Sequence, residues 1–256
     1  MSQPRPTAAS LFVTCVVDQL YPEIGESTVR VLTRLGVQVE YDARQTCCGQ
    51  PAFNSGYWSD ARPSARRFLD MYRDNEYVVI PSGSCASMVK VFYEELFHDD
   101  PAVLAEVHAV APRVFELSQF LVDVLGVKTL PLTGRREEAG KVTYHEACHL
   151  RRELGAKTQA RGLIEAARPG DLVEMEQSDV CCGFGGTFSV KYSEISGAML
   201  KDKIDNIART GAASVVACDS TCLMQIAGGM EKRGTPVRPL HLAQLLDEAT
   251  AGILVK

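Results

Sequence analysis

"TCCGQPAFNSG" (46–56) places two adjacent cysteines directly before a glycine, and "VCCGFGGTFS" (180–189) repeats this arrangement in the second half of the chain. Adjacent cysteines are poorly suited to a disulfide with each other. Their Cα atoms lie about 3.8 Å apart, whereas a disulfide usually joins Cα atoms roughly 4.4–6.8 Å apart. Two neighbouring thiolates can instead bind one multinuclear metal centre, so the segments around both pairs decide the fold and its chemistry.

The two halves share more than the cysteine pairs. Each half begins with an apolar run that delivers a cysteine, and a short strand candidate precedes the pair. A buried-strand run that ends at a further cysteine follows, and then an apolar tail. The matching segments are LFVTCVV (11–17) and KVTYHEAC (141–148), VQVEY (37–41) and DLVEM (171–175), YVVIPSGSC (77–85) and SVVACDSTC (214–222), and LSQFL (117–121) and LAQLL (242–246).

Helical patterns separate these segments, with apolar residues three or four positions apart. A glycine or an Arg-Pro-Gly stop ends the first pattern in each half. The first helices are predicted from Ile24, Val31, Leu32 and Leu35, and from Leu154, Ala160, Leu163, Ile164 and Ala167; the second from Ala65, Phe68, Leu69 and Tyr72, and from Ile195, Met199, Ile204 and Ile207.

Strands that alternate with helices favour a parallel sheet. We therefore predict an α/β fold of two pseudo-symmetric parallel-sheet lobes that arose by internal duplication. The lobes span residues 10–128 and 140–250, and the polar segment TGRREEAG (133–140) links them. In parallel sheets the loops at the carboxyl ends of the strands gather functional groups, so the cysteines of each lobe are expected to converge.

Each half contributes four cysteines in matching positions, and these are the predicted cofactor-binding and metal-binding residues: Cys15, Cys47, Cys48 and Cys85, and Cys148, Cys181, Cys182 and Cys222. Buried structural cysteines, a zinc site and a thiol–disulfide enzyme are alternatives. Zinc sites usually use C-x2–4-C pairs, and redox enzymes use C-x-x-C, and neither spacing occurs in these sets. Four thiolates per site, with adjacent cysteines on different irons, favour iron–sulfur ligation.

The composition limits the compartments and the classes of partner that fit this protein. The chain has 256 residues, of which 46% are hydrophobic, and a net charge of −5. The negative charge and the lack of basic runs argue against nucleic acid, and no apolar stretch approaches the ~20 residues of a membrane helix. The apolar start (8–17) lacks a signal-peptide cleavage site, and nine cysteines favour metal or redox chemistry in a reducing compartment. We expect a cytoplasmic protein without a membrane span or nucleic-acid partner.

Two histidines flank Cys148. Imidazoles there can donate hydrogen bonds to the sulfurs of a metal centre or bond only to the backbone, and the sequence leaves both interpretations open for His145 and His149. Other expectations are surface or capping positions for His98, His108 and His241, shielding of the metal centres by Phe53 and Phe188, and a solvated helix start at Arg151 and Arg152. Cys218 receives no role.

The cysteine pairs, each with an upstream and a downstream cysteine, resemble the CCG (cysteine-rich) domain. That domain occurs twice in the cysteine-rich component of heterodisulfide reductase, in the iron–sulfur component of glycolate oxidase and in the lactate utilization protein A family. The segments PSGSCASM (81–88), YHEACHLRRELG (144–155) and DSTCLMQI (219–226) look most like the last of these. The resemblance covers roughly residues 10–250.

This resemblance implies an iron–sulfur subunit without flavin that transfers electrons in the oxidation of L-lactate to pyruvate, together with lactate utilization proteins B and C. Electron transfer for glycolate or a heterodisulfide, and a non-catalytic metal-binding scaffold or sensor, are the alternatives. One departure from the CCG pattern matters. The full pattern ends in C-x-x-C, but Ser82 and Asp219 stand where the fifth cysteines would be. We therefore expect one or two four-cysteine clusters of the [4Fe–4S] type.

Overall fold

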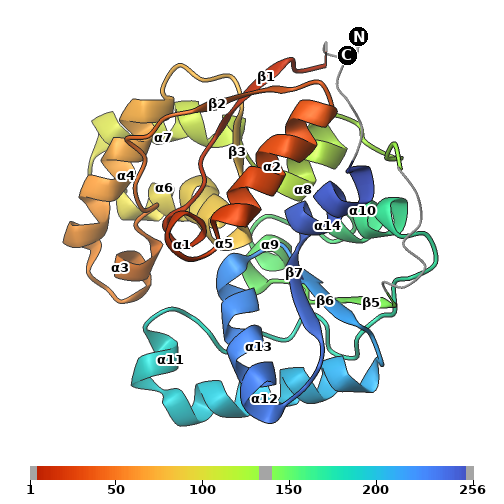
Figure 1. Ribbon diagram of the computed structural model, residues 1–256. Coiled ribbons are helices and arrows are strands. Elements are labelled where there is room, and N and C mark those ends of the chain that lie inside the picture. Colours follow the sequence, from red (N-terminus) through yellow and green to blue (C-terminus); the bar gives the residue numbers. More distant parts are fainter. Residues whose placement is uncertain (1–4, 133–139, 252–256) are drawn as a thin grey trace.

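Two parallel β-sheets, one in each half of the chain, form the frame of the molecule (Figure 1). The structure is a computed structural model that describes residues 5–132 (lobe one) and 140–251 (lobe two). Lobe one has the strand order β2-β1-β3-β4 and lobe two β5-β6-β7. The strands are β1 (Ala8–Leu11), β2 (Gln38–Tyr41), β3 (Val78–Ile80), β4 (Val114–Glu116), β5 (Val142–Tyr144), β6 (Ser214–Ala217) and β7 (Arg238–His241). The predicted fold class is confirmed; residues 133–139 of the predicted linker lie outside the described residues.

Helices connect the strands, as the alternating pattern predicts. In lobe one they are α1 (Cys15–Leu20), α2 (Pro22–Arg34), α3 (Gln50–Asn54), α4 (Trp58–Tyr72), α5 (Gly83–Ser87), the π-helical η1 (Met88–Phe92), α6 (Tyr93–Leu96), α7 (Pro101–Val110), the 3₁₀ turn η2 (Ala111–Arg113), α8 (Leu117–Gln119) and the π-helical η3 (Phe120–Val124). In lobe two they are α9 (Cys148–Arg152), α10 (Gln159–Ala167), α11 (Phe188–Lys191), α12 (Ser193–Arg209), α13 (Ser220–Arg233) and α14 (Leu242–Thr250).

The sequence-based expectations differ from the structure in three places. Strands β4 and β7, which add one strand to each sheet, were not predicted. The predicted strand 171–175 is reduced to a single bridge between Leu172 and Val142, and Met175 beyond it is buried. Leu154 follows α9 instead of lying in α10, and Ile195 on α12 is 56% exposed rather than buried.

The lobes are joined by helices of each lobe that pack against helices of the other (Figure 1). The first long helix of lobe one, α2, packs against the last helix of lobe two, α14, and the equivalent α10 packs against α8. Asp247 on α14 accepts hydrogen bonds from Ser27, Arg30 and Arg34 on α2. One apolar core therefore runs through both lobes, from Leu11 in β1 to Val215 in β6. A second core fills the outer side of lobe one around Phe68 and Tyr93.

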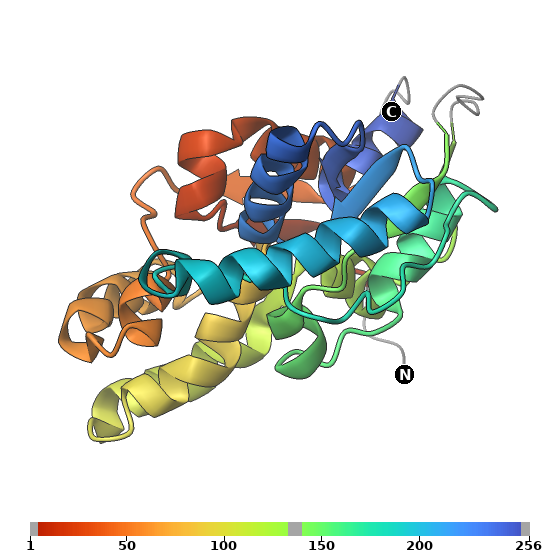
Figure 2. The same cartoon turned by 90° about the horizontal axis from the view of Figure 1, so that it is seen from below.

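A second pair of helix contacts between the lobes lies nearer the centre of the molecule. Helix α5 of lobe one packs against α9 of lobe two, and α13 of lobe two packs against α1 of lobe one. Gly83 allows the first approach, since a Cβ there would lie 2.9 Å from the Leu150 Cβ. On the outer side of lobe two, α12 lies across α13 (Figure 2). None of the helices within the described ranges combines the length and apolarity that a membrane crossing needs.

Candidate metal-binding site between the lobes

The cysteines of each lobe gather at the carboxyl ends of its strands, where parallel sheets place their functional loops. In lobe one, Cys15 begins α1 after β1, the pair follows β2, and Cys85 lies in α5 after β3. Lobe two repeats this with Cys148 at the start of α9, the pair before α11 and Cys222 in α13. Each predicted cysteine set is therefore brought together by its own sheet.

Both sets face the same cavity. It has a volume of about 390 Å³, lies between the lobes and is lined by all eight predicted cysteines: Cys15, Cys47, Cys48, Cys85, Cys148, Cys181, Cys182 and Cys222. The α5–α9 and α1–α13 contacts bring the two sets to this common space. The carboxyl edges of the two parallel sheets thus converge on one thiol-rich chamber.

Within each lobe the thiols form a chain of neighbours. The Cys15 and Cys47 Sγ atoms lie 3.7 Å apart. Hydrogen bonds with the thiols of Cys15 and Cys48 lower the pKa of Cys47 to about 3, while the bond with Cys47 and burial raise the pKa of Cys15. Cys48 also bonds to Cys85, so the order is Cys15–Cys47–Cys48–Cys85.

Lobe two has the same order, Cys148–Cys181–Cys182–Cys222. Bonds with Cys148 and Cys182 lower the pKa of Cys181 to about 2. The first cysteine of each pair also accepts a backbone N–H two residues on: from Gly49 to Cys47 at 3.4 Å, and from Gly183 to Cys181 at 3.3 Å. Four contiguous thiols with N–H groups aimed at sulfur fit a thiolate-bound metal group, because such hydrogen bonds stabilise sulfur ligands.

A hydrogen-bonded pair occupies the two positions of the missing fifth cysteines. Ser82 and Asp219 come from different lobes, and the Ser82 hydroxyl donates to the Asp219 carboxylate at 3.2 Å. The backbone N–H of Ser84 donates to the same oxygen at 2.9 Å. Although burial alone would raise the pKa of Asp219, hydrogen bonds from Thr221 and Ser84 lower it below its ordinary value. These positions therefore join the lobes instead of supplying sulfur.

The two histidines beside Cys148 both lie at the cysteine set. His149 lines the cavity, and its Nδ1 lies 3.7 Å from the Cys148 Sγ. His145 is fully buried, and one of its ring nitrogens lies within 4.8 Å of the Sγ atoms of Cys182 and Cys222. Burial, together with the nearby Lys203 ammonium, lowers the pKa of His145 to about 3, so the ring is neutral.

Other predicted residues have different surroundings from those expected. Phe53 stacks on Trp58 and Phe188 packs against Tyr192, and neither is among the described residues that line the cavity. Phe184, two residues after the second pair, lines it instead. Its place inside the glycine-rich run was the available sequence signal.

Two further expectations, and the surroundings of Cys218, can be compared with the structure. Arg151 forms an ion pair with the buried Glu146 at 2.6 Å, so it is not simply solvated. His241 caps α14 as expected, accepting the Ala243 N–H, but it is fully buried. Cys218 is fully buried beside the Tyr144 hydroxyl.

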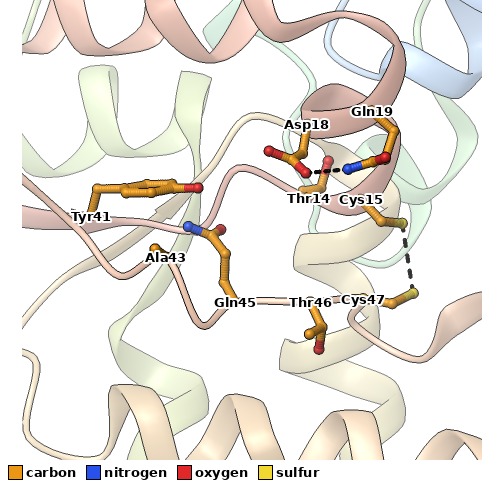
Figure 3. A pocket seen from close by; sticks show the side chains of 9 residues that line it. All are labelled: Thr14, Cys15, Asp18, Gln19, Tyr41, Ala43, Gln45, Thr46 and Cys47. Carbon is orange, nitrogen blue, oxygen red and sulfur yellow. Dashed lines mark hydrogen bonds between the residues drawn. The ribbon is translucent and has the colours of Figure 1, made fainter.

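Lobe one also has a second pocket, of about 400 Å³, next to two of its cysteines (Figure 3). Cys15 and Cys47 line both this pocket and the central cavity. The other walls are polar, with the side chains of Asp18, Gln19 and Gln45 around the two thiols. Two of the four metal ligands predicted in lobe one therefore line two cavities.

Known proteins resemble the chain along most of its length. The CCG cysteine-rich domain matches twice, over residues 9–90 and 142–227. "Lactate utilization protein A" of Geobacillus kaustophilus is 43% identical over 238 residues, which cover 93% of this chain and 98% of that protein. The protein of the same name from Oceanobacillus iheyensis is 42% identical over 95% of this chain and 98% of its own length. With two cysteine-rich domains and relatives this similar, the chain belongs to the lactate utilization protein A family.

Proposed function

We propose that the chain is an iron–sulfur subunit that transfers electrons during the oxidation of L-lactate to pyruvate. The observation that carries this proposal is the convergence of two four-cysteine sets on one cavity. Four thiolates are the usual ligand set of a [4Fe–4S] cluster, and such clusters exchange single electrons. The names of the similar proteins support a role in lactate utilization.

The chain's own residues hold and shield the proposed clusters. Hydrogen bonds from neighbouring thiols lower the pKa of Cys47 and Cys181, which favours the thiolate form of these two side chains. Cys48 and Cys182 are the buried members of the two pairs, and Phe184 forms part of the cavity wall. Exclusion of water around a cluster is one of the factors that set its potential.

Oxidation of lactate to pyruvate releases two electrons and two protons, so a separate catalytic group must accept them from the substrate. We assign that step to partner proteins, and on the family resemblance we propose that these are lactate utilization proteins B and C acting in the cytoplasm. This chain then passes electrons between the partners and an acceptor. Activity should therefore require the complex and not this chain alone.

Serine variants of the paired cysteines test the proposal. The complete complex should reduce an acceptor when lactate is added, and Cys48→Ser or Cys182→Ser should abolish that activity while the chain still folds. Cys218→Ala, which changes a buried cysteine outside the predicted ligand sets, should retain it. Full lactate oxidation by the isolated chain, or by complexes with either serine variant, would contradict the proposed role.

A non-catalytic metal-binding scaffold is the alternative function. It requires bound metal but no change of oxidation state. Reversible reduction of the bound metal, followed by absorbance and electron paramagnetic resonance (EPR), supports electron transfer. Metal that stays redox-silent over the range used by iron–sulfur proteins supports the scaffold.

A further inference from the structure

The two cysteine sets differ in the residue that stands three positions before the first cysteine of each set. Phe12 stands three residues before Cys15, and His145 stands three residues before Cys148. Both residues occupy the same place in their sheets: the Phe12 N–H donates to Val79 O in β3, and the His145 N–H to Val216 O in β6. Lobe one therefore has a phenyl ring where lobe two has an imidazole.

A second difference in residue type between the lobes lies beside the first. The glycine after each pair faces a backbone carbonyl of the next long helix, Ala61 in lobe one and Ser196 in lobe two. Seven residues beyond these are Phe68 and Lys203. Phe68 packs edge-to-face on Phe12, with ring centroids 5.0 Å apart. The apolar pair of lobe one is thus replaced in lobe two by His145 and the buried Lys203.

The His145 ring has no conventional partner. Neither ring nitrogen makes a hydrogen bond within the described part of the chain, although the residue is fully buried. Buried polar groups are nearly always paired, because an unpaired one has lost its hydrogen bonds to water without replacing them. One ring nitrogen lies within 4.8 Å of the sulfurs of Cys182 and Cys222. A metal ion held between these three residues would give the imidazole its missing partner.

The loop around the ring is fixed in place. Lys203 Nζ donates to the carbonyls of Gln177 and Ser178 at 2.7 and 3.2 Å. Gln177 adopts the left-handed region, with φ +55°, which is unusual for a residue other than glycine. The Ser178 carbonyl, which also accepts the Glu146 N–H, lies near the His145 ring. Ligating histidines commonly direct their second ring nitrogen at such a carbonyl.

We propose that His145 is a nitrogen ligand of the metal group held by Cys182 and Cys222, so that lobe two binds metal through thiolate and imidazole and lobe one through thiolate alone. This rests on the proposed metal binding, but not on iron–sulfur chemistry, because imidazole binds iron, cobalt and zinc alike. The four thiols and His145 give lobe two five donors. The two sites are then chemically distinct despite their shared fold.

Pulsed EPR on the full-length chain tests this directly. The protein is labelled with ¹⁵N-histidine, reconstituted anaerobically with iron and sulfide, and reduced. The variants are His145→Phe, which copies lobe one, and His145→Gln, which keeps a polar side chain and decides the matter if the phenylalanine variant does not fold. His149→Val copies Val16 of lobe one at the neighbouring histidine and serves as the matched control.

The wild type and His149→Val should show a strongly coupled nitrogen that changes with the ¹⁵N label, and the His145 variants should lose it. Its absence from the wild type, or its persistence in the His145 variants, would overturn the proposal. If no variant takes up iron and sulfide, the proposed function fails, and Co²⁺ added to the metal-free chain decides this inference. A cobalt spectrum altered only by the His145 variants supports it, and identical spectra in all variants overturn it.

Discussion

The glycine after each cysteine pair controls the geometry of the site most directly. Gly49 and Gly183 have φ values of +88° and +86°, in the region that side chains rarely adopt. A Cβ on Gly183 would lie 2.7 Å from Ser196 O, and one on Gly49 would lie 3.0 Å from Ala61 O. The turn that aims a backbone N–H at the first sulfur of each pair therefore has room only for glycine.

Replacing Gly183 with alanine should destabilise the protein and disturb metal binding. The positive φ alone costs roughly 1–2 kcal/mol, and the contact with Ser196 O adds to that. Gly186→Ala is the control, since Gly186 also has a positive φ but no atom lies within 4 Å of its added Cβ. Urea unfolding should show a larger loss for Gly183→Ala; equal losses would mean that the close contact has no effect.

At the same scale, Glu116 makes stability depend on pH. It is fully buried, and burial raises its pKa to about 7 from an ordinary value of 4.5. The folded protein therefore keeps this proton to a higher pH than the unfolded chain. Its contribution is fully present below about pH 4.5 and is lost as the pH rises to about 7.

Glu116→Gln should remove that part of the pH dependence. The glutamine oxygen can still accept the Ser118 N–H at the start of α8. Relative to the wild type, the variant should gain up to about 3 kcal/mol between pH 4.5 and pH 8, from the size of the shift. Urea unfolding at several pH values measures this, and parallel curves for the two proteins would show that Glu116 does not titrate in this range.

At the scale of elements, one carboxylate joins the starts of two helices from different lobes. Asp219 caps α13 through the Thr221 N–H and also accepts the Ser84 N–H of α5. The backbone N–H of Gly83 donates across the same junction to Cys218 O at 3.1 Å. The pair that replaces the fifth cysteines is thus part of the contact between lobes.

Asp219→Ala should cost about 2–4 kcal/mol, because it removes a helix cap and leaves the Ser84 N–H buried without an acceptor. Asp100→Ala is the control: Asp100 caps α7 at the exposed edge of lobe one, and its loss should cost about 1 kcal/mol. Thermal unfolding compares the two. Equal costs would indicate that Asp219 acts only as a cap and does not join the lobes.

At the scale of the whole molecule, the repeat in the sequence was sufficient to predict two parallel-sheet lobes and the grouping of four cysteines in each. The strands β4 and β7 were not predicted, because each is short and runs directly into the helix that it precedes. The packing of α2 and α10 against helices of the opposite lobe could not be predicted either, since periodicity gives the apolar face of a helix but not the helix against which it packs. The contacts of α5 with α9 and of α1 with α13, which periodicity does not give either, bring both cysteine sets to one cavity.

The difference between the lobes was visible in the sequence but had no interpretation there. His145 was noticed beside Cys148, yet its alternatives stayed open because spacing says nothing about hydrogen-bond partners. The structure shows a buried ring facing two sulfurs, with Phe12 at the matching place in lobe one. Pseudo-symmetry of the backbone therefore coexists with different residues beside the two cysteine sets.

The most direct test of the account is the iron and acid-labile sulfide content of the chain after anaerobic purification and reconstitution. If each lobe holds one [4Fe–4S] cluster, the protein should contain about eight iron and about eight sulfide per chain. It should also absorb broadly near about 400 nm and lose that absorbance reversibly on reduction. Cys48→Ser and Cys182→Ser should each lose about half of the iron. Colourless protein that contains stoichiometric zinc and no sulfide would contradict the account.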